Sequence, residues 1–198
     1  MKKFALLCAV VCLSIGAIAQ TAPAEGVSTT NIVCVEARHA DGTPFYHHCG
    51  HNLKTTAGID FMATAIGSSA YPYSSLGPPE VINLSNDSAS PAAGDCVTYT
   101  SSCTFPGVLQ NSGMLAATAT YAHTAGTSTY TLTHTWTATG TVSNIQKVSV
   151  SWQPLASGGG GCSVGPSGPC SYIFENTFTP VSLSANDQLQ VTWTVTIS

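Results

Sequence analysis

The sequence is poor in charge, and poorest in positive charge. Lysine and arginine together number 5 of 198 residues, aspartate and glutamate number 9, and charged residues make up 7% of the chain, whereas ordinary soluble domains contain about 25%. Beyond residue 3 the cations are Arg38, Lys54 and Lys147. Three scattered cations cannot neutralise a run of phosphates, so we exclude nucleic-acid binding and an electrostatic attachment to anionic lipid.

Motifs for common enzyme chemistry are scarce as well. The glycine-rich run at residues 158–168 lacks the Lys-Ser or Lys-Thr of a phosphate-binding loop. A glycosidase needs two positioned carboxylates, yet nothing in the sequence pairs acids inside predicted elements such as Asp60 and Glu175. We therefore expect a protein that is not an enzyme and that needs no cofactor.

The N-terminus has the pattern of a bacterial secretory signal peptide. Lys2 and Lys3 precede an apolar run from Phe4 to Ile18, and small residues flank the expected cleavage site before Gln20. The run is short for a membrane span, which needs about 20 apolar residues. We expect residues 1–19 to be removed and the mature protein to be secreted, extracellular or at the cell surface, with no membrane attachment.

Six of the eight cysteines remain after this cleavage, and an even number in an exported chain indicates disulfides. Six cysteines allow 15 pairings, but here they form three pairs that are close in sequence. A zinc site would need clustered C-x-x-C spacing, which is absent. We expect the disulfides Cys34–Cys49, Cys96–Cys103 and Cys162–Cys170.

The mature chain has the pattern of an all-β domain. In residues 189–197, Leu189 and the following odd-numbered apolar residues alternate with glutamine and threonine, which places one face in a core and a threonine ladder on the other. Further strands are expected at residues 29–37, 45–49, 81–84, 115–123, 128–139, 145–153 and 172–178. This series predicts a β-sandwich or jelly-roll-like domain over residues 56–198, preceded by an N-terminal arm and disulfide-linked hairpin over residues 20–55.

One helix is expected, over residues 56–66. Its predicted apolar face contains Ile59, Met62, Ala63 and Ile66, which recur at helical spacing. Thr55 or Thr56 is expected to cap its start, and Gly67 to end it. We expect the aromatic and methionine side chains of this segment to contact the core.

Several polar residues are candidates for binding. His47, His48 and His51 are candidate metal ligands, because neutral imidazoles often bind transition metals. His47 and His48 would point to opposite faces of a strand, so we expect polar hairpin residues rather than a metal site. Asp87 and Asp95 lack the alternating oxygen ligands of a calcium loop.

Glycans are the other candidate ligands. Tyr71 and Tyr73 lie in a Pro- and Ser-rich loop and are candidate glycan contacts, whereas the three tryptophans lie in alternating strands and are expected in the core. The segments beginning at Asn83 and Asn86 fit the N-glycosylation pattern of a glycoprotein.

Three blocks resemble structural proteins of tailed-bacteriophage virions. Residues 51–58 (HNLKTTAG) resemble their HNLVTTAG segment, which precedes a short helix. Residues 82–85 and 90–95 (INLS, SPAAGD) are similar to their IALGTG…APAATD strand and loop. Residues 178–196 resemble their FSPVTL..GDTLTVTWTIT terminus. The resemblance implies a repeating structural β-subunit of the tail or decoration type without catalytic residues, and the signal peptide and cysteines place this chain outside a bacterium.

Two functional hypotheses follow. In the first, the protein assembles with itself into an extracellular filament or surface appendage, and residues of its N-terminal arm add a strand to a neighbouring subunit. The residues of this assembly arm are Thr29, Thr30, Asn31, Ile32 and Val33. The alternative for this segment is pairing within its own domain. In the second hypothesis, the protein is a monomeric adhesion or glycan-binding module.

Overall fold

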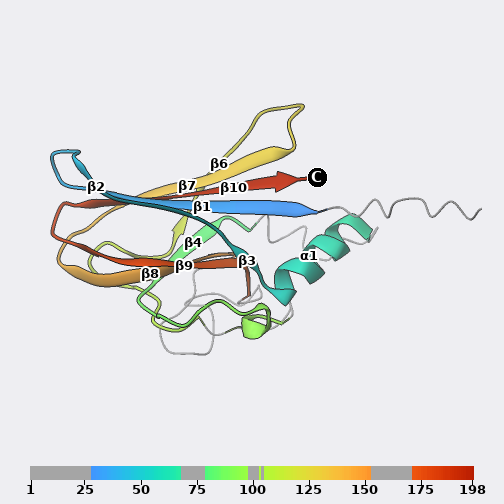
Figure 1. The fold of residues 1–198 in the computed structure, drawn as a ribbon, viewed down its shortest axis with the longest axis horizontal. Helices are drawn as coiled ribbons and strands as arrows, with labels where there is room; N and C mark the ends of the chain where they lie inside the picture. The colour runs from blue at the N-terminus through green and yellow to red at the C-terminus, as the bar shows by residue number, and fades with distance from the viewer. Residues whose placement is uncertain (1–27, 68–78, 98–102, 104, 153–170) are drawn as a thin grey trace, which may run out of the picture.

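The computed structural model describes residues 28–67, 79–97, 103, 105–152 and 171–198. Within these residues the chain forms two antiparallel five-stranded sheets that pack face to face, with one α-helix at one end of the sandwich (Figure 1). The predicted β-sandwich with one short helix and an N-terminal hairpin is confirmed.

Sheet A has the strand order β2-β1-β10-β7-β6. Its strands are β1 (Thr29–Arg38), β2 (Pro44–His51), β6 (Thr120–His123), β7 (Thr129–Thr137) and β10 (Gln188–Ile197). β1 pairs with β10 along its whole length. β1 and β10 therefore lie inside the sheet, and β2 and β6 form its two edges.

Sheet B has the strand order β3-β9-β8-β4-β5. Its strands are β3 (Leu53–Lys54), β4 (Val81–Ser85), β5 (Ala117–Thr118), β8 (Val142–Ser151) and β9 (Tyr172–Leu183). The edge strands β3 and β5 contain two residues each. A 3₁₀ turn, η1 (Ala93–Asp95), lies in the loop that follows β4.

The strand expected at residues 115–123 is divided between the sheets. β5 belongs to sheet B and β6 to sheet A, and Ala119 between them is buried. The backbone N–H of Ala119 donates a hydrogen bond to the carbonyl of Glu80, 2.8 Å away. The prediction of one continuous strand is wrong here, because continuous alternation in sequence does not reveal a change of sheet.

Strand β9 is longer than the expected 172–178. It continues through Pro180, which has no backbone N–H to donate to a neighbouring strand. The pairing of β8 with β9 is irregular between Ile145 and Lys147, beside this proline. The irregular pairing accommodates the proline, as is usual for proline within sheets.

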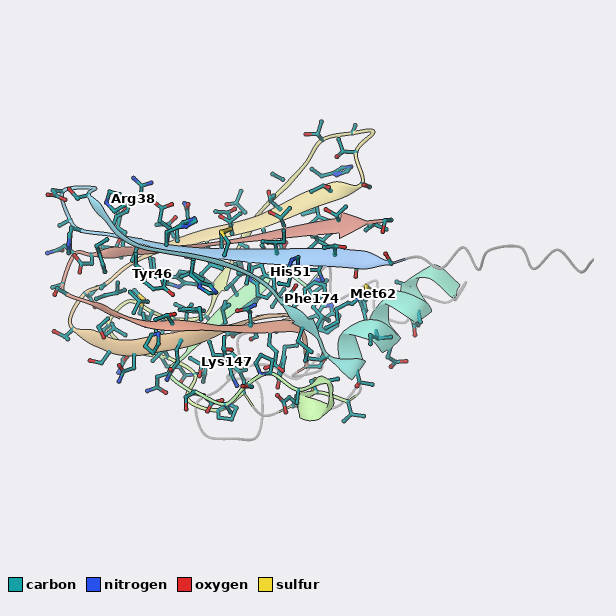
Figure 2. All side chains as sticks on the ribbon, viewed as in Figure 1. Arg38, Tyr46, His51, Met62, Lys147 and Phe174 are labelled. Carbon is teal, nitrogen blue, oxygen red and sulfur yellow. A yellow bond between two sulfur atoms is a disulfide. The ribbon has the colours of Figure 1, made fainter. Side chains whose placement is uncertain are left out.

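The core lies between the sheets and contains the three tryptophans, as expected. Trp136, Trp152 and Trp193 are all buried. Phe174 of sheet B stacks on Trp193 of sheet A, with 5.9 Å between ring centroids. Figure 2 shows Phe174 between the two sheets. This contact joins the inner faces of the two sheets.

Helix α1 (Thr56–Gly67) has the predicted extent and cap. The hydroxyl of Thr55 accepts a hydrogen bond from the backbone N–H of Gly58 at 3.1 Å, which is the geometry of an N-cap. A side chain at Gly58 would collide with the backbone carbonyl of Ile173. Glycine therefore allows the first turn of the helix to lie directly against β9.

The predicted apolar face of α1 is wrong in part. Ile59 is 52% exposed and Ala63 is also exposed, whereas Ala57 is buried. Phe61 packs edge-on against Trp152, with 4.8 Å between ring centroids. The helix contacts β9 mainly through its first turns. Which of its side chains are buried therefore depends on where the helix touches the sheet, and not on the periodicity of its sequence.

Two of the three expected disulfides lie in the described residues and are confirmed. Cys34–Cys49 joins β1 to β2, and Cys96–Cys103 closes a short loop beside sheet B. The expected pair Cys162–Cys170 lies outside the described residues.

Candidate functional site

A cleft of about 300 Å³ opens where the chain passes from sheet A to sheet B. Its lining residues come from the β2–β3 crossover, from β9 and from the loop before η1, and they are His51, Asn52, Leu53, Pro91, Asn176 and Thr177. β3 pairs with only two residues of β9, Glu175 and Phe174, so on the β3 side of β9 no strand pairs with Asn176 in the described structure, whereas β8 pairs with it on the other side. The short edge strand thus leaves room for the cleft.

The cleft is polar but uncharged, and it contains amide groups without partners. The side-chain nitrogen of Asn176 donates to the carbonyl of His51 at 2.6 Å, which fixes the orientation of this side chain. The Asn176 Oδ1 and both amide atoms of Asn52 are enclosed and have no hydrogen-bond partner among the described residues. Such groups are able to receive a ligand that both donates and accepts hydrogen bonds.

A second polar cluster lies on the outer face of sheet B, beneath the loop of residues 86–95. Lys147 is buried, and its ammonium group donates to a carboxylate oxygen of Asp87 at 2.6 Å. Figure 2 shows Lys147 on the side of sheet B that faces this loop. Burial favours a higher pKa for Asp87, but its hydrogen bond and charge interaction with Lys147 outweigh this effect and hold the pKa below its usual value.

Glu175 is the most deeply buried acid of this cluster, with 1% of its surface exposed. Burial is the main reason that its pKa is raised to about 8, and the nearby carboxyl group of Asp95 raises it further. Glu175 is therefore mainly protonated at neutral pH. Both of its carboxyl oxygens are enclosed without a hydrogen-bond partner among the described residues, so it does not pair with Asp60.

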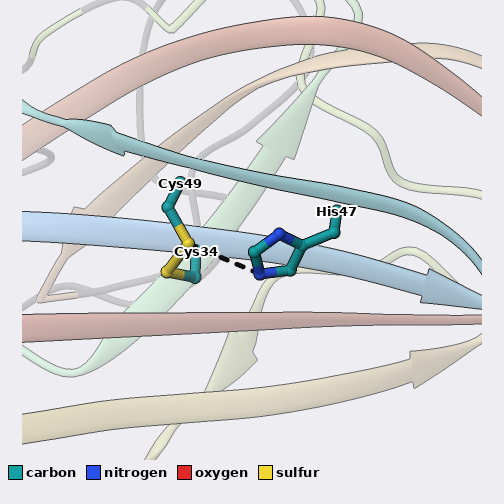
Figure 3. A group of neighbouring side chains, drawn as sticks. All are labelled: Cys34, His47 and Cys49. Atoms are coloured by element: carbon teal, nitrogen blue, oxygen red, sulfur yellow. Dashed lines mark hydrogen bonds between the residues drawn. A yellow bond between two sulfur atoms is a disulfide. The ribbon is translucent and has the colours of Figure 1, made fainter.

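The three candidate metal-binding histidines lie in different surroundings. His47 Nε2 is 3.5 Å from the sulfur of Cys49, beside the Cys34–Cys49 disulfide on the outer face of sheet A (Figure 3). His48 lies beside Phe178, and His51 lines the cleft. Within the described ranges, one group of three potential ligand atoms lies within 4.8 Å, and it comprises His47 and the two bonded cysteines.

The sulfurs of this group are joined in a disulfide, so they offer no thiolate to a metal. The three histidines do not converge on a common point in the structure. We therefore retain His47 as a neighbour of the disulfide and His51 as a cleft residue.

The outer face of sheet A is a broad surface of hydroxyl groups. On β7 and β10 it carries these residues: Thr129, Thr131, Thr133, Thr135, Thr137, Gln188, Gln190, Thr192, Thr194 and Thr196. Cross-strand hydrogen bonds join Thr129 to Thr196 at 3.0 Å and Thr133 to Thr192 at 3.3 Å. The threonine ladder expected on β10 thus continues across β7, without a charged residue on either strand.

The expected assembly arm, Thr29–Val33, forms the first half of β1. It pairs with β10 of the same chain, and Ile32 and Val33 also pair with β2. Val33 is fully buried. This position corresponds to the alternative in which the segment completes its own sheet, and the rest of the arm, residues 20–27, lies outside the described residues.

The two candidate glycosylation sites differ in accessibility. Asn83 lies in β4, is fully buried and donates to Ser151 at 2.8 Å, so an enzyme cannot reach it in the folded protein. Asn86 is exposed. Of these two asparagines, Asn86 is the one that is available for modification after folding.

Some candidates lie outside the described residues. They include the possible glycan contacts Tyr71 and Tyr73 and the glycine-rich run. Residues 161–165 (GCSVG) carry the letters of the G-x-S-x-G pattern of serine hydrolases, and they lie in the same undescribed segment. In a hydrolase this serine sits between a strand and a helix, whereas the sequence here predicts a loop.

No protein-family model, curated protein or solved structure shows a significant match to this chain. The resemblance to phage structural proteins therefore rests on the three sequence blocks. In the structure, residues 51–58 span the end of β2, β3 and the start of α1, and the last block covers the second half of β9 and most of β10.

The two disulfides indicate an oxidising compartment. Across the described ranges, no helix is both long and apolar enough to cross a membrane.

Sequence analysis did not identify Asn52, Asn176 or Glu175 as site residues. Asn176 meets the carbonyl of His51, a residue 125 positions away, and no local pattern signals this contact. Asn52 lies in the HNLKTTAG block, but nothing in that block marks it as a site residue.

Proposed function

We propose that the mature chain is a secreted, non-enzymatic structural subunit. It assembles with copies of itself into an extracellular filament or surface appendage through the free edges of sheet A. The observation that carries this proposal is the contrast between the edges of the two sheets. The edges of sheet B are two residues long, whereas sheet A ends in the eight-residue β2 and the four-residue β6.

Neither edge of sheet A is protected by charge. The residues of β6 (TYAH) are all exposed, and neither β6 nor β2 (PFYHHCGH) contains lysine, arginine, aspartate or glutamate. Proteins commonly prevent edge pairing with charged residues, prolines, bulges or short edge strands. In β2, a proline and an adjacent register shift occur at one end only, beside Arg38.

The positions of the two edges favour an open polymer. Because β2 and β6 lie on opposite edges of the same sheet, pairing β6 of one copy with β2 of the next is a head-to-tail contact. Each addition leaves the same two edges free at the ends, so the contact can repeat without closing. The secretory signal pattern, the low charge and the resemblance to repeating phage subunits support the same function.

The disulfide restricts strand exchange as an alternative mechanism. Cys34–Cys49 joins β1 to β2, so residues 29–33 cannot separate far from β2. Exchange with a neighbour would therefore require the whole hairpin, residues 29–51, to leave β10. We favour edge pairing because it leaves all the pairings within the subunit intact.

A charge placed on β6 tests the proposal. Ala122 lies opposite Thr131 on the outer face, at the edge of the sheet. Ala122→Lys should abolish filaments, because a lysine on a free edge opposes pairing with a second strand. The matched control is Gln190→Lys, which adds the same charge to β10, between β1 and β7.

Sedimentation velocity and negative-stain electron microscopy would compare the three proteins. We expect polymers from the wild type and from Gln190→Lys, and monomers from Ala122→Lys. Polymers that persist in a folded Ala122→Lys protein would contradict pairing through β6.

A further inference from the structure

The cleft at the β2–β3 crossover has no role in the proposed assembly. It lies beside β9 and the loop of sheet B, whereas the assembly contact uses the outward edges of sheet A. His51 is shared between β2 and the cleft, but Asn52 and Asn176 belong to neither free edge. The cleft therefore requires an explanation of its own.

Its unpaired amides make the cleft costly as a purely structural feature. Asn176 is 5% exposed and Asn52 is partly buried, yet their three amide atoms have no partner in the described structure. An enclosed polar atom without a partner costs about 1–3 kcal/mol, and most such groups in native proteins are paired. An apolar residue at position 52 would avoid part of this cost, which suggests a role in binding.

We propose that the cleft binds a neutral sugar unit, a hexose or an N-acetylhexosamine, of a surface glycan. The amide of Asn52 offers a donor and an acceptor side by side, which matches neighbouring hydroxyl groups or an acetamido group. Leu53 and Pro91 supply apolar surface for the C–H groups of the ring, and Asn176 Oδ1 supplies a further acceptor.

The size and charge of the cleft agree with this ligand class. Its volume of about 300 Å³ is at the lower end for small-ligand sites, which favours a single ring over a long oligosaccharide segment. None of the lining residues is an acid, a lysine or an arginine, so a charged ligand would find no counter-charge among them. Glu175 precedes Asn176 in β9 but is not among the lining residues.

Ligand-observed NMR tests the proposal with five named probes. Saturation transfer is measured from the mature protein, residues 20–198, to glucose, galactose, mannose, N-acetylglucosamine and N-acetylgalactosamine. We expect a signal from at least one sugar, and its loss in Asn52→Ala. Asn111→Ala, which removes an exposed asparagine from another part of the surface, is the matched control and should keep the signal.

A thermal melt separates binding from a structural role. Because the Asn52 side chain makes no hydrogen bond to the described protein, Asn52→Ala should not lower the Tm by more than about 2 °C. A signal that survives in Asn52→Ala, or silence from all five sugars, would overturn the proposal. A large fall in Tm would also overturn it, because the amide would then be structural.

Two further variants separate this site from other surfaces. Tyr71→Ala combined with Tyr73→Ala should keep the signal, and loss of binding in that protein alone would place the sugar elsewhere and contradict the proposal. The Ala122→Lys subunit should also bind the sugar, because its substitution is on the far edge of sheet A. Failure of assembly and failure of sugar binding are thus observed independently.

Discussion

The outer faces of the two sheets are built from similar alternating strands but have different surroundings. On sheet A, the threonines and glutamines of β7 and β10 face solvent or are partly covered. On sheet B, the corresponding polar residues of β8, among them Lys147 and Ser149, are buried beneath the loop of residues 86–95. The edges differ as well, since those of sheet B are short and those of sheet A are longer and uncharged.

This difference indicates that the two sheets have different roles in the sandwich. The covered face of sheet B holds its loop through buried charges and acids, so substitutions there should alter folding. The open face and edges of sheet A contribute fewer internal contacts and remain available to another molecule. The comparison can be tested by making similar changes on the two sheets.

The largest stability effect is expected from Lys147→Ala. This change removes the cation that pairs with Asp87 under the loop, and loss of one partner of a buried pair costs about 4 kcal/mol. Urea unfolding would measure the loss. Gln190→Ala on the open face is the control and should change the free energy of unfolding by about 0.5 kcal/mol or less. Equal effects of the two changes would remove the distinction between the faces.

Removal of the two disulfides should give the next largest losses of stability. Cys34 and Cys49 are 15 positions apart, and Cys96 and Cys103 are 7 apart. By loop entropy alone, replacing the first pair by serine should cost about 3 kcal/mol and replacing the second about 2 kcal/mol. Urea midpoints of the two double variants would give the order. A larger loss from the second pair would show that packing of the buried Cys96 and Cys103 outweighs loop length.

Glu175 should give the stability of the protein a pH dependence. Its pKa is raised from 4.5 to about 8 in the folded state, so the folded protein binds more protons than the unfolded chain between these values. Stability should therefore fall as the pH rises through this window, by about 2 kcal/mol between about pH 5 and pH 7. Unfolding measurements on the wild type and on Glu175→Gln at each pH would measure this fall in stability. The glutamine variant should lack this contribution, and an unchanged slope would contradict the assignment to Glu175.

The smallest effect on stability is expected from a change on the open outer face of sheet A. Thr194→Val keeps the shape of a partly buried side chain on β10 and removes one hydroxyl group. We expect a change in the free energy of unfolding within about 0.5 kcal/mol, measured by urea unfolding. A loss of more than about 2 kcal/mol would mean that the hydroxyl surface is structural rather than available for contact.

The sequence was most informative where a strand has one face in water. Residues 189–197 alternate strictly, and β10 has the predicted orientation because solvent covers its threonine face. The same rule cannot predict that Lys147 and Glu175 are buried, because their cover comes from Asp87 and Asp95, which are distant in sequence. Local patterns describe one strand, whereas burial depends on what else packs against it.

The candidate sites show the same limit. Local spacing was sufficient for Cys34–Cys49 and Cys96–Cys103, because these partners are close in the chain. The cleft forms only when the β2–β3 crossover meets β9, so neither Asn52 nor Asn176 was recognisable from its own neighbours. The division of residues 115–123 between two sheets was hidden for a related reason, since both parts have strand-like sequences.

Negative-stain electron microscopy of the purified mature protein over a range of concentrations tests the central claim most directly. We predict regular filaments of wild-type protein, with polymer length that increases with concentration and with no filaments from Ala122→Lys. Wild-type protein that remains monomeric at every concentration, as judged by parallel sedimentation velocity, would contradict self-assembly through sheet A.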